Sequence, residues 1–287
     1  MMGVVEREAI ADAHVSAPRS GVAMAVVGTS HSSAAMAMGL EAPTQLRGGP
    51  KVAARLRCAD FGWQPDVPAL LAHAAKTAER GAVAFGAILL EGEPGAGRTH
   101  LARRLAHIAG VPHVTIDLPG GGLEQLAQRR RGPDFVLPTA PVLAIAACRA
   151  ANPIISLLGV DELREDAQEL LVRMIDPATS SRWPDPAAGG TVDLSHVSWF
   201  IQSHLPDRIA PRLAHLLRPV RMFWPTDDAV ALHAIEVLAE AAIDENVATP
   251  PTTVIEQIIG ETQSRHAQRS TAALYRRACD LICQEAR

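Results

Sequence analysis

The length, composition and charge of the chain are those of a globular protein that can bury a large core. Its 287 residues are 48% hydrophobic, 3% aromatic and 20% charged, and they suffice for one large domain or two small ones. The apolar residues are mostly Ala, Leu, Val and Ile, which is typical of a helix-rich α/β protein. A formal net charge of −4 argues against a bulk electrostatic attraction to nucleic acid or to an anionic membrane.

The cysteines and the N-terminal residues predict a location in the cytoplasm. None of the four cysteines has the paired spacing of a zinc site, and we expect Cys279 and Cys283 on one helix face as reduced thiols. No run of about 18 apolar residues predicts a transmembrane helix. Glu6, Glu8 and Asp12 stand where a secretory signal would have basic residues, so we expect a cytoplasmic protein.

Residues 1–50 differ from the rest of the chain in composition. They are rich in Ala, Gly, Ser, Met and Thr, and they show no sustained periodicity. Such a segment cannot bury enough apolar surface to offset the entropy of ordering it. We therefore expect a disordered N-terminal tail.

Helix and strand patterns alternate in residues 51–225. Apolar residues recur at helical spacing from Asp66 until Gly81, and a second helical pattern covers residues 99–108. Short apolar runs that predict strands lie at residues 87–91, 113–118, 154–158, 197–201 and 220–224. This alternation predicts an α/β domain whose parallel sheet is flanked by helices on both faces.

The strand pattern stops after Pro225. Three helical patterns follow, at residues 227–242, 252–259 and 271–285. We therefore expect a small helical subdomain at 226–287, after the α/β domain at 51–225.

A glycine-rich sequence joins the first predicted strand to the helix that follows it. It reads, in order, Gly92, Glu93, Pro94, Gly95, Ala96, Gly97, Arg98 and Thr99. It matches the phosphate-binding GxxxxGK[ST] loop at every fixed position except the lysine. Its glycines let backbone N–H groups converge on phosphate oxygens, while the following helix points its positive end at them and Thr99 can bind Mg²⁺. These residues predict a nucleotide-binding site.

Arg98 stands where this loop usually has lysine. Arginine keeps the positive charge, but its planar guanidinium is longer and bulkier than the compact ammonium of lysine. It can hold phosphate oxygens in the ground state and still fit the transition state of hydrolysis poorly. The sequence therefore predicts nucleotide binding more firmly than hydrolysis.

The ordered set of motifs resembles the AAA+ ATPase superfamily, and within it the ATPase module of Lon-type proteases. The resemblance covers roughly residues 65 to 285. It is carried by the phosphate-binding loop and by the stretches 114–121, 152–155, 176–177 and 193–195. It implies a P-loop NTPase fold with a helical lid, ATP and Mg²⁺ as cofactors, and assembly with further copies or with partner AAA+ subunits.

In this family the third strand ends in an Asp-Glu pair, whose Asp orients Mg²⁺ and whose Glu activates the attacking water. Two alignments are open here. If the strand at 154–158 extends by two residues, the pair is Asp161 and Glu162. Counted without a gap from the start of the strand, the two positions fall on Leu158 and Gly159. We favour Asp161 and Glu162, although adjacent acidic residues are also typical of a helix N-terminus.

The resemblance implies two further residues at the nucleotide. The family has a polar, water-orienting residue after the fourth strand, and His204 aligns best with it. Arg269, at the start of the last predicted helix, matches the family's sensor arginine, which contacts the γ-phosphate and makes lid closure depend on nucleotide.

Two features that the family uses between subunits match this sequence less closely. Arg212 and Arg218 are candidates for the arginine finger, whereas His215 is the closest aligned position. Residues 129–136 occupy the place of the loop that grips polypeptide in the central pore, with Phe135 as its aromatic residue. Of the two interpretations, we favour a plain loop that anchors Phe135 in the core.

Three functions are compatible with the sequence. The first is an ATPase that couples ATP hydrolysis to the remodelling of a protein client, and the second is a nucleotide-binding switch or scaffold with little turnover. The third, a nucleic-acid-handling AAA+ helper, is disfavoured by the acidic net charge. Too few residues follow the lid for a proteolytic domain, so we expect no peptidase activity from this sequence.

Overall fold

The computed structural model describes most of the chain between residues 44 and 285. The described residues are 23–24, 44–61, 63–118, 126, 129–130, 136–185, 188, 190–247, 250–264 and 270–285. Most of the predicted tail lies outside them. In this part of the chain, every helix lacks the length or the hydropathy needed to cross a bilayer.

The predicted α/β fold with a helical C-terminal part is confirmed, and the element boundaries agree closely with the predicted ones. The strands are β1 (Ala23–Met24), β2 (Thr44–Gln45), β3 (Ala87–Gly92), β4 (His113–Asp117), β5 (Arg129–Arg130), β6 (Val136–Leu137), β7 (Ile154–Leu158), β8 (Trp183–Asp185), β9 (Gly190–Val192), β10 (Ser198–Ser203) and β11 (Arg218–Met222). The α-helices are α3 (Pro50–Cys58), α4 (Val67–Glu79), α5 (Arg98–Ala109), α7 (Ala140–Cys148), α8 (Glu165–Ile175), α9 (Pro177–Ser180), α10 (Pro211–Leu216), α11 (Asp227–Asp244), α12 (Thr252–Ser264) and α13 (Thr271–Glu285). Two 3-10 turns, η3 (Val160–Glu162) and η5 (Pro206–Arg208), follow β7 and β10.

Five parallel strands form the central sheet, in the order β11-β3-β10-β7-β4. β10 lies in the middle, and all six of its residues are buried. Its register pairs Gln202 with Leu90 of β3 on one side and with Leu158 of β7 on the other. The carboxyl ends of these strands therefore meet at one edge of the sheet, which is where ligands bind in open α/β folds.

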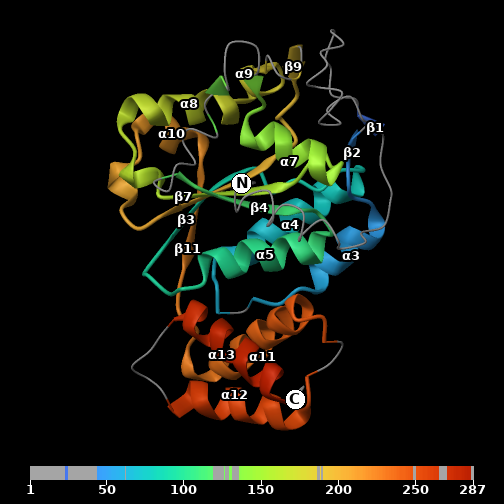
Figure 1. The fold of residues 1–287 in the computed structure, drawn as a ribbon, viewed down its shortest axis with the longest axis vertical. Coiled ribbons are helices and arrows are strands. Elements are labelled where there is room, and N and C mark those ends of the chain that lie inside the picture. Colours follow the sequence, from blue (N-terminus) through green and yellow to red (C-terminus); the bar gives the residue numbers. More distant parts are fainter. Residues whose placement is uncertain are drawn as a thin grey trace.

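Helices cover both faces of the sheet (Figure 1). Ile88 and Leu90 of β3 pack with α3, α4 and α5 on one face. Leu89, between them, points to the opposite face, where it joins the cluster formed with α7, α8 and α10. Successive side chains of a strand alternate between faces, so a sheet that is covered twice needs strands that are apolar throughout.

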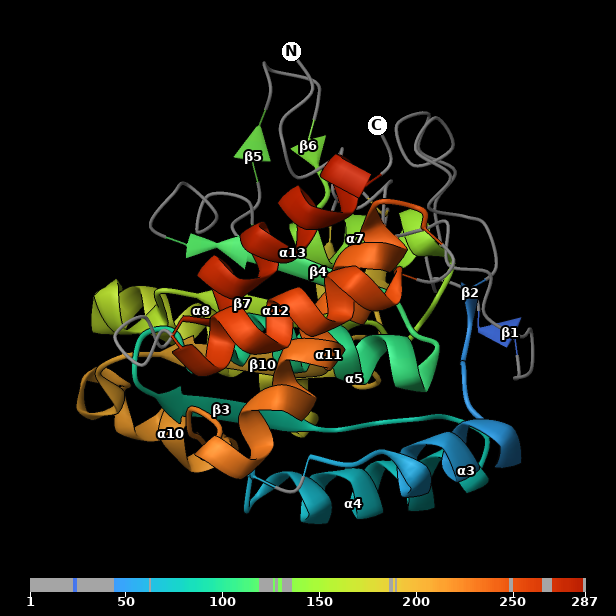
Figure 2. The ribbon, with the colours of Figure 1, turned by 90° about the horizontal axis from the view of Figure 1, so that it is seen from below.

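The three C-terminal helices form a lid with an apolar cluster of its own. Ala234 and Val237 of α11, Ile258 of α12 and Ala278 of α13 lie in this cluster and are fully buried. The lid is drawn in orange and red at the foot of Figure 1, and Figure 2, seen from below, shows α11 running beside α5. The lid therefore adjoins the helix that follows the glycine-rich loop.

The residues just before α3 are packed against the α/β domain, although their composition placed them in the tail. The backbone N–H of Arg47 donates to Oδ1 of Asn152 at 2.9 Å, and Asn152 donates back to the Arg47 carbonyl at 2.8 Å. The Arg47 guanidinium also donates to the Cys148 carbonyl at 3.2 Å. Tertiary hydrogen bonds, which composition does not reveal, hold this segment in place.

Candidate nucleotide-binding site

The glycine-rich loop lies between β3 and α5, and two of its glycines are required by close contacts. Gly92 has a φ of +157°, and a Cβ there would lie 2.5 Å from the Met222 carbonyl oxygen of β11. Gly97 has a φ of +90°, and a Cβ there would lie 2.8 Å from Oγ1 of Thr271 in the lid. Both positions therefore exclude larger residues, for reasons of space as well as of backbone conformation.

Arg98 is the first residue of α5, and its side chain is folded back onto the loop. The residue is 8% exposed. Its guanidinium donates to the Gly92 carbonyl, and Nη2 lies 2.8 Å from Nδ1 of His204. Burial lowers the pKa of Arg98, while the charge of Asp161 acts in the opposite direction. Arginine remains a cation even with a lowered pKa, so this charge is held at the edge of the loop.

Thr99 contacts Gln202 of β10, a residue that the sequence analysis did not single out. Its hydroxyl donates to Oε1 of Gln202 at 3.0 Å. Nε2 of Gln202 is buried and has no hydrogen-bond partner among the described residues. A buried amide N–H without a partner costs free energy, so it marks a place where a ligand acceptor fits. Gln202, one of the polar residues that end β10, thus contacts the predicted Mg²⁺ ligand Thr99, whereas the ring of His204 contacts Arg98.

Asp161 and Glu162 lie in different surroundings. β7 ends at Leu158 and does not extend to Asp161, because Gly159 turns the chain with a φ of 70°. Oδ2 of Asp161 accepts hydrogen bonds from the backbone N–H groups of His204 at 3.0 Å and of Leu205 at 2.9 Å. Burial acts to raise the pKa of Asp161, but these hydrogen bonds outweigh it and lower the pKa. Glu162 is exposed.

The lid rests directly on the glycine-rich loop through the first residue of α13. The backbone N–H and the hydroxyl of Thr271 both donate to the Gly95 carbonyl oxygen, each at 3.0 Å. A cavity of about 340 Å³ opens between the loop, the end of β10 and the lid. Its lining residues are Gly95, Ala96, Gly97, Arg98, Thr99, His100, Arg103, Gln202, Glu240, Thr271, Ala272, Tyr275 and Arg276. The cavity has the size and the backbone donors that a nucleotide phosphate chain requires.

The lid arginine that lines this cavity is Arg276, within α13. The predicted sensor residue, Arg269, lies outside the described residues, so its role stays a prediction. Leu274 and Ala278 of α13 face the lid core, which leaves the exposed Arg276 on the side toward the loop. The helical pattern alone could not reveal which exposed residue would face the cavity.

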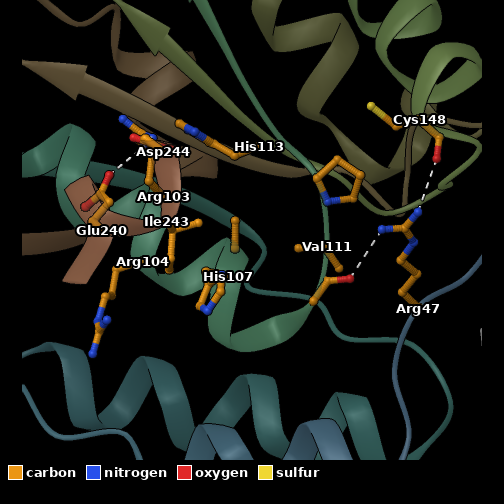
Figure 3. A pocket seen from close by; sticks show the side chains of 13 residues that line it. Arg47, Arg103, Arg104, His107, Val111, His113, Cys148, Glu240, Ile243 and Asp244 are labelled. Carbon is orange, nitrogen blue, oxygen red and sulfur yellow. Dashed lines mark hydrogen bonds and ion pairs between the residues drawn. The ribbon is translucent and has the colours of Figure 1, made fainter. Parts of the chain in front are cut away.

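Charged side chains join α5 to α11. Nε of Arg103 lies 2.8 Å from Oε1 of Glu240, and Arg103 also pairs with Asp244. Figure 3 shows these groups beside a second, smaller cavity of about 80 Å³, which Arg47 closes from the other side. These pairs are partly buried, so solvent screens them less than it screens surface pairs.

The residues proposed to act between subunits stay predictions. Nη1 of Arg212 pairs with Oε1 of Glu169 of the same chain at 2.6 Å, and Arg218 is exposed. In the region of the expected pore loop, β5 and β6 pair as antiparallel strands. Phe135 lies outside the described residues, so its role stays a prediction.

Replacing Thr271 by valine should weaken the contact between the lid and the loop without changing the shape of the side chain. The variant loses the hydroxyl that bonds to Gly95, and we expect the free energy of unfolding to fall by about 1–2 kcal/mol. Urea unfolding followed by circular dichroism measures this difference. Thr253→Val, which removes an exposed hydroxyl near the end of α13, is the control and should be neutral. An unchanged midpoint for Thr271→Val would mean that the hydroxyl contributes nothing.

Comparisons with known proteins agree with this geometry. No protein-family model matches the chain. The chain is 26% identical over 212 residues to Lon protease 2 of Thermus thermophilus, a match that covers 69% of this chain and 26% of that protein. It is 25% identical over 225 residues to the mitochondrial Lon protease homolog of Aspergillus fumigatus, covering 72% and 20% respectively. It thus spans about a quarter of the length of these relatives.

A solved structure has the same fold. It is a cryo-EM reconstruction of Hsp104 in its closed state with ATPγS and FITC casein, and it matches with a TM-score of 0.61 at 13% identity. The match covers 82% of this chain and 47% of that one. The parallel sheet, the glycine-rich loop, the helical lid and these likenesses together show that the chain resembles the AAA+ ATPase module of Lon proteases.

Proposed function

We propose that this chain binds Mg·ATP and acts as a nucleotide-dependent switch, in which the occupied loop sets the position of the lid and hydrolysis is slow. The observation that carries the proposal is the contact between Thr271 of the lid and Gly95 of the loop. A ligand bound at the loop can move the lid only if the contacts between loop and lid differ between the ligand-bound and the ligand-free position of the lid. A direct hydrogen bond from lid to loop is such a contact.

Several features of the loop support ATP as the ligand. The backbone of residues 95–97 and the N-terminus of α5 would hold the phosphates, with Arg98 as the cation beside them. The Thr99 hydroxyl and the Gln202 amide would face the Mg²⁺ ion and its waters. The bound ion would neutralise phosphate charge. The residues of this chain orient the phosphates, exclude water from them and connect them to the lid.

The positions of the carboxylates support slow hydrolysis. Of the described residues that line the cavity, Glu240 alone carries a carboxylate, and it is already bonded to His100 and Arg103. Asp161 accepts backbone N–H groups of the segment after β10, and Glu162 is exposed. A general base must come within hydrogen-bond reach of the attacking water. No described carboxylate of the cavity is free to do so.

Phosphate release from Mg·ATP, measured beside a binding titration, tests the proposal. We expect saturable ATP binding with turnover far below about 1 per second, and we expect the same turnover in Glu162→Gln. Glu165→Gln, which changes an exposed glutamate at the start of α8, is the matched control. An absence of ATP binding would refute the proposal.

A working ATPase that remodels a protein client is the second candidate. It is supported by the similarity to proteins named Lon protease and by the fold shared with Hsp104, whose structure contains FITC casein. In that case turnover would reach about 1 per second and Glu162→Gln would abolish it. Both candidate functions include assembly with further copies or with partner AAA+ subunits. Light scattering with and without ATP measures this assembly.

A further inference from the structure

α5 of the α/β domain and α11 of the lid bring three metal-ligating side chains together. His100 comes from α5, and His233 and Glu236 lie one turn apart on α11. One ligand atom from each of the three lies within 4.8 Å of the others. His233 is 2% exposed and Glu236 is 7% exposed, so the cluster is shielded from bulk water.

The hydrogen bonds around the two histidines determine which ring nitrogen carries the proton. Nδ1 of His100 bonds to the Glu240 carboxylate, which only accepts, so Nδ1 is the donor and Nε2 keeps its lone pair. The Thr271 hydroxyl donates its single hydrogen to Gly95 and therefore accepts from Nε2 of His233, at 3.1 Å. Nδ1 of His233 is left with its lone pair.

The atoms that remain are all acceptors. Nε2 of His100, Nδ1 of His233 and Oε2 of Glu236 are each buried without a hydrogen-bond partner among the described residues. Buried polar atoms without partners are costly, and in the carboxylate form of Glu236 these three acceptors also repel one another. The buried, unpartnered Nε of Arg104 belongs to the guanidinium that pairs with the other oxygen of Glu236. A water molecule has only two hydrogens to offer three acceptors. A cation satisfies all three at once.

We propose that His100, His233 and Glu236 bind one divalent transition-metal ion, with Zn²⁺ the best match to two imidazoles and one carboxylate. Three protein ligands with a fourth, open position is a common zinc arrangement. For tetrahedral coordination at ordinary Zn–N and Zn–O lengths, no pair of ligand atoms needs to approach by more than about 1.5 Å.

The surroundings of the cluster match those of known metal sites. His100 donates to a carboxylate and His233 to a hydroxyl, and such partners orient metal-bound imidazoles. The rings of Trp63 and Trp224 each pack edge-on against His233, with centroids 5.5 Å apart, and form an apolar wall. Burial lowers the pKa of His233 to about 3, which keeps its imidazole in the neutral form that binds metal.

The remaining charges are compatible with an ion. Nη2 of Arg104 lies 3.4 Å from Oε1 of Glu236, so it occupies the other oxygen and leaves Oε2 for the metal. His100 also lines the 340 Å³ cavity, which provides a route for the ion.

A metal at this place would tie the lid to the α/β domain. The ion would join α5 to α11, and His233 continues through Thr271 to the Gly95 carbonyl of the loop. Metal binding would thereby stabilise the lid in contact with the loop. The metal site itself does not depend on the proposed nucleotide function, because it can be measured without nucleotide.

The test titrates Zn²⁺ into chelator-treated protein without nucleotide, by calorimetry and by thermal unfolding. We expect one ion per chain with a dissociation constant in the micromolar range or below, and a rise in Tm. His233→Gln and Glu236→Gln should each weaken binding at least 100-fold and remove the rise in Tm. If the variants and the natural chain have the same Tm in the presence of chelator, the variants fold normally.

His107→Gln is the control, since it removes an exposed histidine two turns further along α5. It should leave both the affinity and the stoichiometry unchanged. Co²⁺ in place of Zn²⁺ should give visible absorption bands that are lost in His233→Gln. The proposal is overturned if the natural chain binds no stoichiometric Zn²⁺, or if Zn²⁺ binding survives in both His233→Gln and Glu236→Gln.

Discussion

Replacing Arg98 by alanine should weaken the binding of Mg·ATP about 100-fold. A charge-assisted hydrogen bond to phosphate is worth about 1.5–3 kcal/mol, and Arg98 is the buried cation at the edge of the loop. Arg98→Lys keeps the charge, so we expect its affinity to stay within about tenfold of the natural chain. Binding of a fluorescent ATP analogue, with competition by ATP, measures both variants.

Arg212→Ala is the control for this experiment, because it removes a solvent-exposed arginine that pairs with Glu169. It should bind nucleotide normally. Turnover should remain low in Arg98→Lys, since the carboxylates and not the loop cation limit hydrolysis in our proposal. If Arg98→Lys instead reached about 1 per second, the loop cation would be the limiting residue and the slow-switch proposal would need revision.

Replacing Asp161 by alanine should lower the free energy of unfolding by about 2–3 kcal/mol. The carboxylate accepts the backbone N–H groups of His204 and Leu205, and the variant removes this acceptor from both. Chemical unfolding measures the loss, with Asp207→Ala of the exposed turn η5 as the control. A fully stable Asp161→Ala protein with weakened Mg·ATP binding would support the metal-orienting role that the family resemblance implies.

The stabilisation by Asp161 should also depend on pH. Its pKa is lower in the folded chain than its ordinary value near 4, because the hydrogen bonds favour the carboxylate. Its contribution is therefore present above about pH 4 and is lost as the pH falls through the folded-state pKa. The difference in stability between the natural chain and Asp161→Ala should shrink on acidification below about pH 4. A difference that is constant down to pH 2 would contradict this account.

The segments that the sequence did not predict have identifiable physical causes. α7 is apolar from end to end, including its exposed Ala147, so no amphipathic period remains. α3 is short, and Lys51, Arg55 and Arg57 interrupt its apolar face. Such segments give weak helical signals, whereas α4, with one buried and one exposed face, was predicted correctly.

The residues of the candidate site also divide into those that a local motif predicts and those that only folding brings together. The glycines of the loop and Thr99 are close in sequence, so a local motif predicts them. Gln202, Arg276 and the cluster of His100, His233 and Glu236 are assembled from segments that lie far apart in the chain. A single sequence contains no signal that pairs α5 with α11.

By itself, the sequence determined the α/β fold, the five strands of the sheet and the three lid helices in chain order, and the loop that predicts phosphate binding. These features follow from local periodicity and from glycines at fixed spacing, both of which act over a few neighbouring residues. Only the tertiary structure decided that β7 does not extend toward Asp161, that Asp161 bonds to the segment after β10, and that Thr271 rests on Gly95. The physical reason is that burial and hydrogen bonding between distant segments decide which polar groups are free to act.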